Sequence, residues 1–262
     1  MPPPVAGFDA EERAYDGQSR VVHRRGSGPA VVVLSEVPGI TPRVADFARR
    51  VAALGCTAVV PHLFGTDGKA PSAGYALRSL AGCCVSREFV VLARGRTSPV
   101  TRWLRALARD EHARCGGPGV GVVGMCLTGG FALAMLVDPS VVAPVLSQPS
   151  LPLPVSAAHR RDLGIDEEDL EEVRRRVAEG ACVLGLRFTG DRACPADRFA
   201  RLAEELGDGF VAVELDSSPG NPAGHRRNAH SVLTEDLDDR PGTPTRQALD
   251  RVLGFLGDRL LA

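Results

Sequence analysis

A cysteine lies on a glycine-flanked turn between an apolar, β-branched run and a helix-forming run. The segment is Val120-Gly-Val-Val-Gly-Met-Cys-Leu-Thr-Gly-Gly-Phe-Ala-Leu-Ala-Met135. A residue at such a turn adopts a strained backbone, and glycines such as Gly124 and Gly129 let the strand and the helix approach closely. The thiol of Cys126 is therefore predicted to project outward, as a nucleophile must. A packed structural thiol is the alternative, because free cysteine is among the most buried residue types.

A thiol nucleophile needs a base and a group that orients the base, and both follow Cys126 along the chain. Asp191 stands in Phe188-Thr-Gly-Asp191, at the end of an apolar run, and His230 stands in a late loop. A histidine can take the proton of the nucleophile and return it to the leaving group, because its pKa lies near neutrality. The aspartate fixes the imidazole tautomer. The sequence therefore predicts a Cys-Asp-His arrangement.

Other residues compete for two of these roles. Asp197 or Asp216 could supply the acid instead of Asp191, since Thr-Gly-Asp is also ordinary turn chemistry. Asp191 is favoured because it directly follows a long apolar run. His225 competes with His230, but it belongs to a proline- and arginine-rich loop that is predicted to be flexible.

A carboxylate stands at the exit of an early buried strand, where charge is unexpected unless it is a cap, a partner or a catalyst. This residue is Glu36, and the next predicted helix begins several residues later, which argues against a simple cap. The N–H of Val37 follows the end of that strand, and the N–H of Leu127 follows Cys126. Both are placed to donate hydrogen bonds to an oxyanion.

Short apolar runs alternate with helical stretches along the chain. The apolar runs are rich in β-branched residues and too short for helices, so they are predicted as buried strands: 30–34, 57–60, 120–123, 141–146, 183–188 and 210–215. The predicted helices are 43–54, 101–113, 130–137, 197–206 and 245–261. This alternation predicts the α/β fold class, with a mostly parallel central sheet and helices on both faces.

Two inserted segments, about 65–95 and 159–180, interrupt the alternation. Long insertions at the carboxyl ends of strands commonly build lids over active sites. The second contains an acidic stretch, Asp166–Glu172, which is predicted to be a solvated surface helix. We interpret residues 1–19 as an N-terminal extension and residues 20–262 as a single domain.

Composition excludes several classes of protein. With 262 residues and a formal net charge of −1, the chain has no basic surface of the kind that binds nucleic acid or membranes. Its start is acidic and lacks the apolar core of a secretory signal. The seven cysteines are scattered without a C-x-x-C pair, which favours reduced thiols in the cytoplasm over disulfides or a metal site. We expect a small-molecule substrate and a monomer or small homo-oligomer.

These motifs resemble the dienelactone hydrolase family, whose members have the α/β-hydrolase fold with a cysteine nucleophile. The resemblance extends from about residue 20 to the last helix. It rests on segments that keep the order of the family: Glu36-Val-Pro-Gly39, Ala53-Leu-Gly-Cys-Thr-Ala-Val-Val-Pro-His-Leu-Phe64, Gly124-Met-Cys-Leu-Thr-Gly-Gly130, Gly190-Asp191 and His230-Ser231.

The resemblance implies a triad of Cys126, Asp191 and His230, with Glu36 close to the thiol. In the family this glutamate is thought to help generate the thiolate when substrate displaces it. The implied reaction is the hydrolysis of a small ester or enol-lactone through an acyl-cysteine, with the oxyanion held by the N–H groups named above. It implies no metal and no organic cofactor.

The sequence departs from the family at several positions. Thr128 replaces the glycine two places after the nucleophile, and His62 stands where the family commonly has aspartate. The arginine that binds the substrate carboxylate in dienelactone-cleaving members is missing after His230. Arg87 is the first choice for a replacement, among the arginines of the first inserted segment: Arg78, Arg87, Arg94 and Arg96.

Two other functions remain open from the sequence. The fold could serve a binding protein or a cyclase-type biosynthetic enzyme that does not hydrolyse, because a fold does not fix a function. A thiol-redox protein could use an exposed Cys126, although no resolving cysteine stands at a redox-type spacing.

Overall fold

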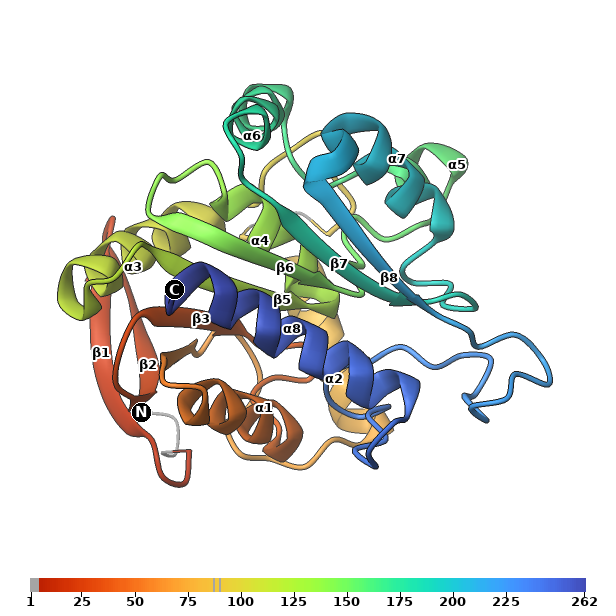
Figure 1. Cartoon of the computed structure of the whole chain (residues 1–262), viewed down its shortest axis with the longest axis horizontal. Coiled ribbons are helices and arrows are strands. Elements are labelled where there is room, and N and C mark those ends of the chain that lie inside the picture. The colour runs from red at the N-terminus through yellow and green to blue at the C-terminus, as the bar shows by residue number, and fades with distance from the viewer. Residues whose placement is uncertain (1–4, 87, 90) are drawn as a thin grey trace.

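The computed structural model describes residues 5–86, 88–89 and 91–262, which form one eight-stranded sheet with helices on both sides (Figure 1). The strands are β1 (Asp9–Tyr15), β2 (Gln18–Gly26), β3 (Ala30–Leu34), β4 (Thr57–Pro61), β5 (Val120–Met125), β6 (Val141–Ser147), β7 (Val183–Phe188) and β8 (Phe210–Leu215). The helices are α1 (Pro42–Ala53), α2 (Ala73–Val85), α3 (Val100–Cys115), α4 (Gly129–Met135), α5 (Ala157–Arg161), α6 (Glu167–Ala178), α7 (Ala196–Leu206) and α8 (Pro244–Leu260).

The strand order is β1-β2-β4-β3-β5-β6-β7-β8. All pairs from β4 to β8 are parallel, whereas β2 runs antiparallel to both β1 and β4. The predicted α/β fold with a mostly parallel sheet is therefore confirmed. In a parallel sheet all carboxyl ends meet at one edge, which is where loops from distant parts of the chain come together.

Alternate residues of the central strands enter two different cores. Val32 and Leu34 of β3 pack on the side covered by α3, α4, α6 and α7. Val31 and Val33 pack on the side covered by α1 and α8. Because every residue of β3 is buried, the strand is apolar throughout instead of alternating with polar residues. This double burial is why the short apolar runs predicted the strands well.

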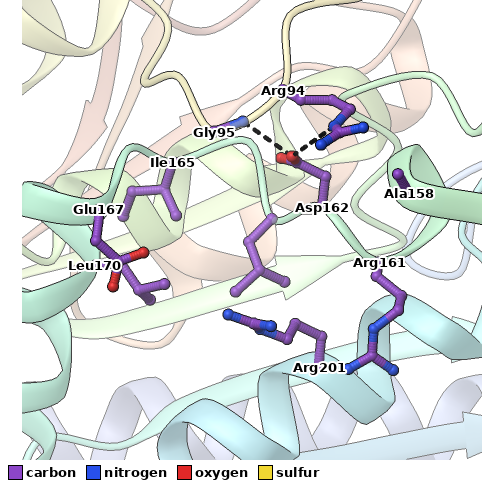
Figure 2. Close-up of a pocket in the computed structure, with 10 residues that line it drawn as sticks. Arg94, Gly95, Ala158, Arg161, Asp162, Ile165, Glu167, Leu170 and Arg201 are labelled. Carbon is purple, nitrogen blue, oxygen red and sulfur yellow. Dashed lines mark hydrogen bonds and ion pairs between the residues drawn. The ribbon is translucent and has the colours of Figure 1, made fainter.

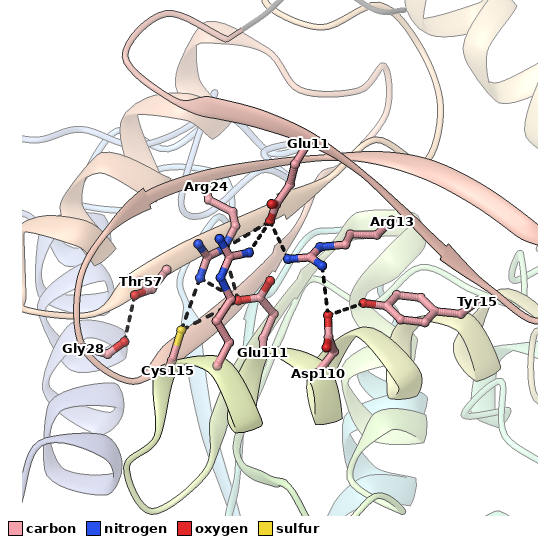
Figure 3. A network of polar contacts seen from close by, with 10 residues as sticks. Glu11, Arg13, Tyr15, Arg24, Gly28, Thr57, Asp110, Glu111 and Cys115 are labelled. Carbon is pink, nitrogen blue, oxygen red and sulfur yellow. Dashed lines mark hydrogen bonds and ion pairs between the residues drawn. The ribbon is translucent and has the colours of Figure 1, made fainter.

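The sequence does not predict the β1–β2 hairpin, most of whose residues are polar and partly exposed. β1 lies within the segment interpreted as an extension and pairs with β2 along its whole length. Figure 3 shows how side chains attach the hairpin to α3: Tyr15 Oη donates to Asp110 Oδ2 at 2.7 Å, and Arg24 pairs with the fully buried Glu111 at 2.9 Å. Polar contacts of this kind leave no hydrophobic period for sequence patterns to detect.

The two inserted segments contact each other. The first contains α2 and the second contains α6. The N–H of Gly95 donates to Asp162 Oδ2 at 2.9 Å, and Thr97 Oγ1 donates to Asp169 Oδ2 at 2.7 Å. Figure 2 shows Asp162 between Gly95 and Arg94, on the wall of a small cavity of about 210 Å³. The segments thus form one connected surface layer.

The acidic stretch belongs to α6, whose outer face carries the ion pairs expected of a solvated helix, including Arg175 with Glu172 at 2.5 Å.

Within the part of the chain that the structure describes, no helix is long and apolar enough to cross a bilayer.

The β5–α4 connection is a tight turn at the carboxyl edge of the sheet. It passes through a single 3₁₀ turn, Cys126–Thr128. A Cβ atom on Gly124 would lie 2.3 Å from the carbonyl oxygen of Thr128, and one on Gly129 would lie 2.6 Å from the Cα of Pro149. Both approaches involve backbone atoms, so no side-chain rotation can relieve them.

We predict that Gly124→Ala destabilises the protein by about 1–3 kcal/mol, because the turn must move to admit the methyl group. The matched control is Gly254→Ala in α8, where a Cβ would have no neighbour within 4 Å. Alanine there should stabilise the helix by about 0.5–1 kcal/mol. Urea unfolding midpoints measure both effects. If both variants changed the unfolding midpoint equally, the turn would have room for the methyl group and the prediction would be wrong.

Candidate active site

Cys126 follows β5 directly and has φ +55°, a left-handed conformation that non-glycine residues rarely adopt. Its side chain is partly exposed. Its carbonyl oxygen accepts a hydrogen bond of 2.9 Å from the N–H of Ser150, in the loop after β6. The structure therefore places the thiol at the carboxyl edge of the sheet, on a turn that is fixed from both sides.

Thr128 explains how the turn tolerates a β-branched residue in place of the usual glycine. The side chain is fully buried, and its Oγ1 accepts a hydrogen bond from the N–H of Met125 at 3.0 Å. The nearest acceptor for its proton is the carbonyl oxygen of Met125 at 2.9 Å, in the same turn, and the carbonyl oxygens of Leu34 and Ser35 lie 3.2 Å away. The hydroxyl thus links the turn to the end of β3.

His230 and Asp191 meet beside the thiol. Asp191 Oδ2 lies 2.6 Å from His230 Nδ1, and Oδ1 accepts from the N–H of Ala193 at 2.9 Å. Burial alone would lower the pKa of His230, but Cys126 and Asp191 outweigh it and raise that pKa well above its usual range. The imidazolium form is therefore favoured between two acidic groups.

Two contacts fix the loop that carries His230. Asp236 Oδ2 accepts hydrogen bonds from the N–H groups of His230 at 2.8 Å and Ser231 at 3.1 Å. Burial raises the pKa of Asp236, but Arg226 and these N–H groups outweigh it, so the pKa is lowered and the carboxylate stays charged. A Cβ on Gly190 would lie 2.4 Å from the carbonyl oxygen of Arg227, so only glycine lets this loop approach.

The competing residues are engaged elsewhere. Asp197 pairs with Arg160 at 2.5 Å. Asp216 is exposed and accepts from the N–H of Ser218 at 2.8 Å. His225 Nδ1 lies 2.8 Å from the carbonyl oxygen of Asp216. Among the described residues, Asp191 is therefore the only one of the three aspartates hydrogen-bonded to His230.

Glu36 is 2% exposed and lies among hydroxyl and amide groups. Its Oε2 accepts from Ser231 Oγ at 2.8 Å and from Gln148 Nε2 at 3.2 Å, while Oε1 accepts from Thr234 Oγ1. Burial raises the pKa of Glu36, although Thr234, His230 and Ser231 oppose this shift. Its hydrogen bonds thus connect Glu36 to the loop that carries His230, and none of the described contacts joins it to Cys126.

Gln148 was not predicted from the sequence. It follows β6 at the carboxyl edge, is fully buried and has φ +36°. Its N–H donates to the carbonyl oxygen of Leu186 at 2.7 Å. The available signal was the polar pair Ser147-Gln148 directly after an apolar strand, the same signal that identified Glu36. For Ser231 and Thr234 the sequence offers no signal beyond their position after His230.

The two predicted oxyanion donors lie at the same edge. Val37 follows Glu36 beyond the end of β3, and within residues 5–86, 88–89 and 91–262 its N–H has no hydrogen-bond acceptor. Leu127 is the second residue of the 3₁₀ turn, so its N–H precedes the first hydrogen bond within that turn. Both N–H groups are therefore available to a ligand.

Arg87, the predicted contact for an anionic substrate, lies outside the described residues. Of the other arginines in that segment, Arg94 lies 4.0 Å from Asp162. Arg78 and Arg96 are exposed.

Comparison with solved structures identifies the class of fold. A putative dienelactone hydrolase from Klebsiella pneumoniae subsp. pneumoniae is 17% identical, with a TM-score of 0.61, 95% of this chain covered and 98% of that chain. The dienelactone hydrolase-like promiscuous phosphotriesterase P91, from metagenomic libraries, is 17% identical, with a TM-score of 0.63 and coverages of 97% and 100%. A cold-adapted esterase from an Arctic intertidal metagenomic library is 15% identical, with a TM-score of 0.59 and coverages of 99% and 97%. The chain therefore has the α/β-hydrolase fold.

A family model narrows this class. The model of the dienelactone hydrolase family matches residues 18–231, most of the chain, so the chain belongs to that family. This membership makes it a hydrolase of the ester or lactone type, which confirms the predicted resemblance and favours hydrolysis over the binding and redox alternatives. Among curated proteins, none matches the chain.

The raised pKa of Glu36 predicts how stability depends on pH. The ordinary value is 4.5, and burial raises it in the folded state. The folded protein then holds this proton more tightly than the unfolded chain, so the contribution of Glu36 is fully present below about pH 4.5 and is lost as the pH rises through the folded pKa. Relative to wild type, Glu36→Gln should therefore become more stable as the pH rises, by about 1.4 kcal/mol for each pKa unit of the shift.

Thermal unfolding midpoints from pH 4 to pH 7.5 measure this difference. Glu168→Gln, which changes an exposed residue of α6, is the control and should parallel wild type at every pH. A difference between Glu36→Gln and wild type that stays constant with pH would contradict the raised pKa.

Proposed function

We propose that the protein hydrolyses a small ester or enol-lactone through a Cys126-His230-Asp191 triad and a covalent acyl-cysteine. The observation that carries this proposal is the contact of His230 Nδ1 with Asp191 Oδ2 at 2.6 Å, at the same edge of the sheet as the Cys126 turn, and the raised pKa of His230 agrees with it. A strained backbone at Cys126 and the free N–H of Val37 support it. Membership of the dienelactone hydrolase family supports the reaction class.

In the first half of the reaction, the Cys126 sulfur attacks the substrate carbonyl carbon while its proton resides on His230. The carbonyl oxygen becomes an oxyanion that accepts hydrogen bonds from the N–H groups of Val37 and Leu127. The C–O bond to the alcohol then breaks, and His230 gives its proton to the leaving oxygen. An acyl-thioester and a free alcohol result; in a lactone both remain one molecule.

In the second half, water attacks the thioester carbon while His230 accepts one of its protons. The C–S bond breaks, the carboxylic acid leaves, and the thiol is regenerated. Asp191 keeps Nδ1 protonated throughout, so that Nε2 performs both transfers. This sequence needs no metal and no organic cofactor.

Glu36 has a proposed role in this site beyond stability. Family resemblance implies that it helps to generate the thiolate when it moves toward the sulfur. In the described state it accepts hydrogen bonds from Ser231 and Thr234, next to His230 in the chain. We infer that these hydrogen bonds fix the loop that carries His230. The Glu36 carboxylate must therefore lose its hydrogen bonds to Ser231 and Thr234 before it can contact Cys126.

The proposal includes the setting in which the enzyme works. All seven cysteines are free, including the sequence neighbours Cys83 and Cys84. Reduced thiols are typical of the cytoplasm. We propose a cytoplasmic monomer or small homo-oligomer that acts on a small molecule, without nucleic acid or membrane partners.

We predict that Cys126→Ala abolishes the hydrolysis of an activated ester such as para-nitrophenyl acetate, because no other group replaces the nucleophile. Wild-type protein treated with an acylating inhibitor should gain one adduct, located at Cys126 by mass spectrometry of peptides. Cys84→Ala changes an exposed cysteine of α2 and should keep both properties. Native turnover by Cys126→Ala would remove the proposal.

The assignment of the acid and the base has its own prediction. Asp191→Asn and His230→Gln should each lower kcat by at least about 100-fold, because the triad acts as a unit. Asp216→Asn and His225→Gln alter the competing residues and should leave kcat within about twofold, since both lie outside the Asp191–His230 contact. If Asp216→Asn and His225→Gln lowered kcat more than the first two variants, the acid and the base would be assigned to the wrong residues.

A further inference from the structure

Asp191 lies in the acid loop, residues 189–195, which joins β7 to α7. Its Oδ2 must stay within hydrogen-bond distance of His230 Nδ1, which comes from a different loop. A displacement of about 1 Å at a reacting site can lower a rate about 100-fold. The groups that fix the two ends of the acid loop therefore affect the chemistry that the site can perform.

Arg187, the last residue but one of β7, places a buried guanidinium group next to this loop. The residue is 2% exposed, and each of its three nitrogens has a partner. Nε donates to the carbonyl oxygen of Cys194 at 3.0 Å, and Nη2 donates to the carbonyl oxygen of Thr189 at 3.0 Å. Nη1 pairs with the carboxylate of Glu214. One side chain thus binds the acid loop near both of its ends.

The alternation of β7 explains why this charged side chain is buried. Leu186 and Phe188 enter the core on the side of α1 and α8. Arg187 therefore points to the opposite side of the sheet, where its guanidinium carbon lies 5.6 Å from the ring centre of Phe199 in α7. A buried cation is unfavourable unless protein oxygens replace its water. Moving the acid loop away would leave the guanidinium without two of its acceptors, so the arginine favours the present position of the loop.

The neighbouring strand β8 fixes the guanidinium group in turn (Figure 1). Arg187 and Glu214 stand directly opposite each other in the parallel pair β7–β8, and their ion pair joins the two strands. Beyond β8, Ser217 Oγ accepts from the N–H of Gly190 at 2.8 Å, and the N–H of Ser217 donates to Thr189 Oγ1 at 3.0 Å. Those two contacts lie at the start of the acid loop, whereas the contact with Arg187 also reaches its far end.

We propose that Arg187 is a positioning residue for the reaction, which holds Asp191 against His230 by binding the acid loop near both ends. This inference rests on the proposed function, because that function makes Asp191 the catalytic acid. Among the described contacts of Arg187, none reaches Cys126 or His230. Arg187 therefore acts through Asp191 and not on the reacting atoms.

Two variants separate the charge of Arg187 from its geometry. Arg187→Lys keeps the positive charge, but its one nitrogen cannot replace the separate Nε and Nη2 donors. Arg187→Met removes the charge as well. The matched control is Arg176→Lys, because Arg176 also binds backbone carbonyl oxygens, those of Leu136 and Asp138, but in the connection that leads to the amino end of β6. All three variants should unfold at a lower temperature than wild type.

On para-nitrophenyl acetate, Arg187→Lys and Arg187→Met should each lower kcat at least about tenfold and change KM by less than about twofold. The reason is that a displaced Asp191 weakens transition-state stabilisation and not substrate binding. Arg176→Lys should keep both constants within about twofold. In protein that already carries Asp191→Asn, adding Arg187→Lys should lower kcat by less than about twofold, since the role acts through Asp191. An unchanged kcat, or the same loss with and without Asp191, would overturn the proposal.

NMR titration of His230 tests the same contact without turnover, in Cys126→Ala protein, where the thiol no longer contributes to the pKa of His230. Loss of a nearby cation would by itself raise that pKa, whereas loss of the Asp191 contact lowers it. Adding Arg187→Met should therefore lower the pKa of His230 by about one unit or more, and adding Arg176→Lys should leave it unchanged.

The two measurements distinguish failure of this inference from failure of the proposed function. Wild-type protein that does not hydrolyse the ester, with a lowered pKa of His230 in the Arg187→Met variant, would refute the function and keep the positioning role. A pKa that rises or stays the same would refute the positioning role, whatever the activity. If Arg187→Lys and Arg187→Met both failed to fold, Arg187 would serve stability alone and the proposal would be wrong.

Discussion

The strained turn at Cys126 is the constraint on which the site depends. A left-handed cysteine is unfavourable by itself, and it persists because its surroundings leave no alternative. Gly124 and Gly129 remove the side chains that would block the turn, and the Thr128 hydroxyl links it to the end of β3. Since β3 lies in the middle of the sheet and is buried on both faces, the turn of Cys126 is anchored to the doubly buried centre of the sheet.

His230 and Asp191 reach this turn from loops, so other contacts must fix their positions. Charged groups provide these contacts: Asp236 holds the N–H groups at the start of the histidine loop, and Asp191 holds the imidazole. Glu36 connects the same loop to the end of β3 through Ser231 and Thr234. Apolar packing of the strands therefore positions the Cys126 turn, and the carboxylates of Asp191, Asp236 and Glu36 position His230 and its loop.

The sequence predicted what depends on apolar packing and local turns. Doubly buried strands such as β3 and the glycine-flanked turn of Cys126 have patterns that few other structures produce. It did not predict the β1–β2 hairpin or the role of Gln148, which depend on contacts between polar residues far apart in the chain. The partners of Glu36 lie more than a hundred positions away from it, and no local periodicity encodes such a separation.

Charge coupling ties Glu36 to the chemistry without direct contact. The charge of His230 favours the ionised form of Glu36, and burial opposes it. Such coupling is reciprocal, so an ionised Glu36 favours the imidazolium form of His230 by the same free energy. In the proposed mechanism His230 gives its proton to the leaving oxygen, and the imidazolium charge that favours ionised Glu36 then disappears. Proton transfer at the imidazole and the state of the buried carboxyl are therefore linked, and the hydroxyls of Ser231 and Thr234 are the groups that must adjust between those states.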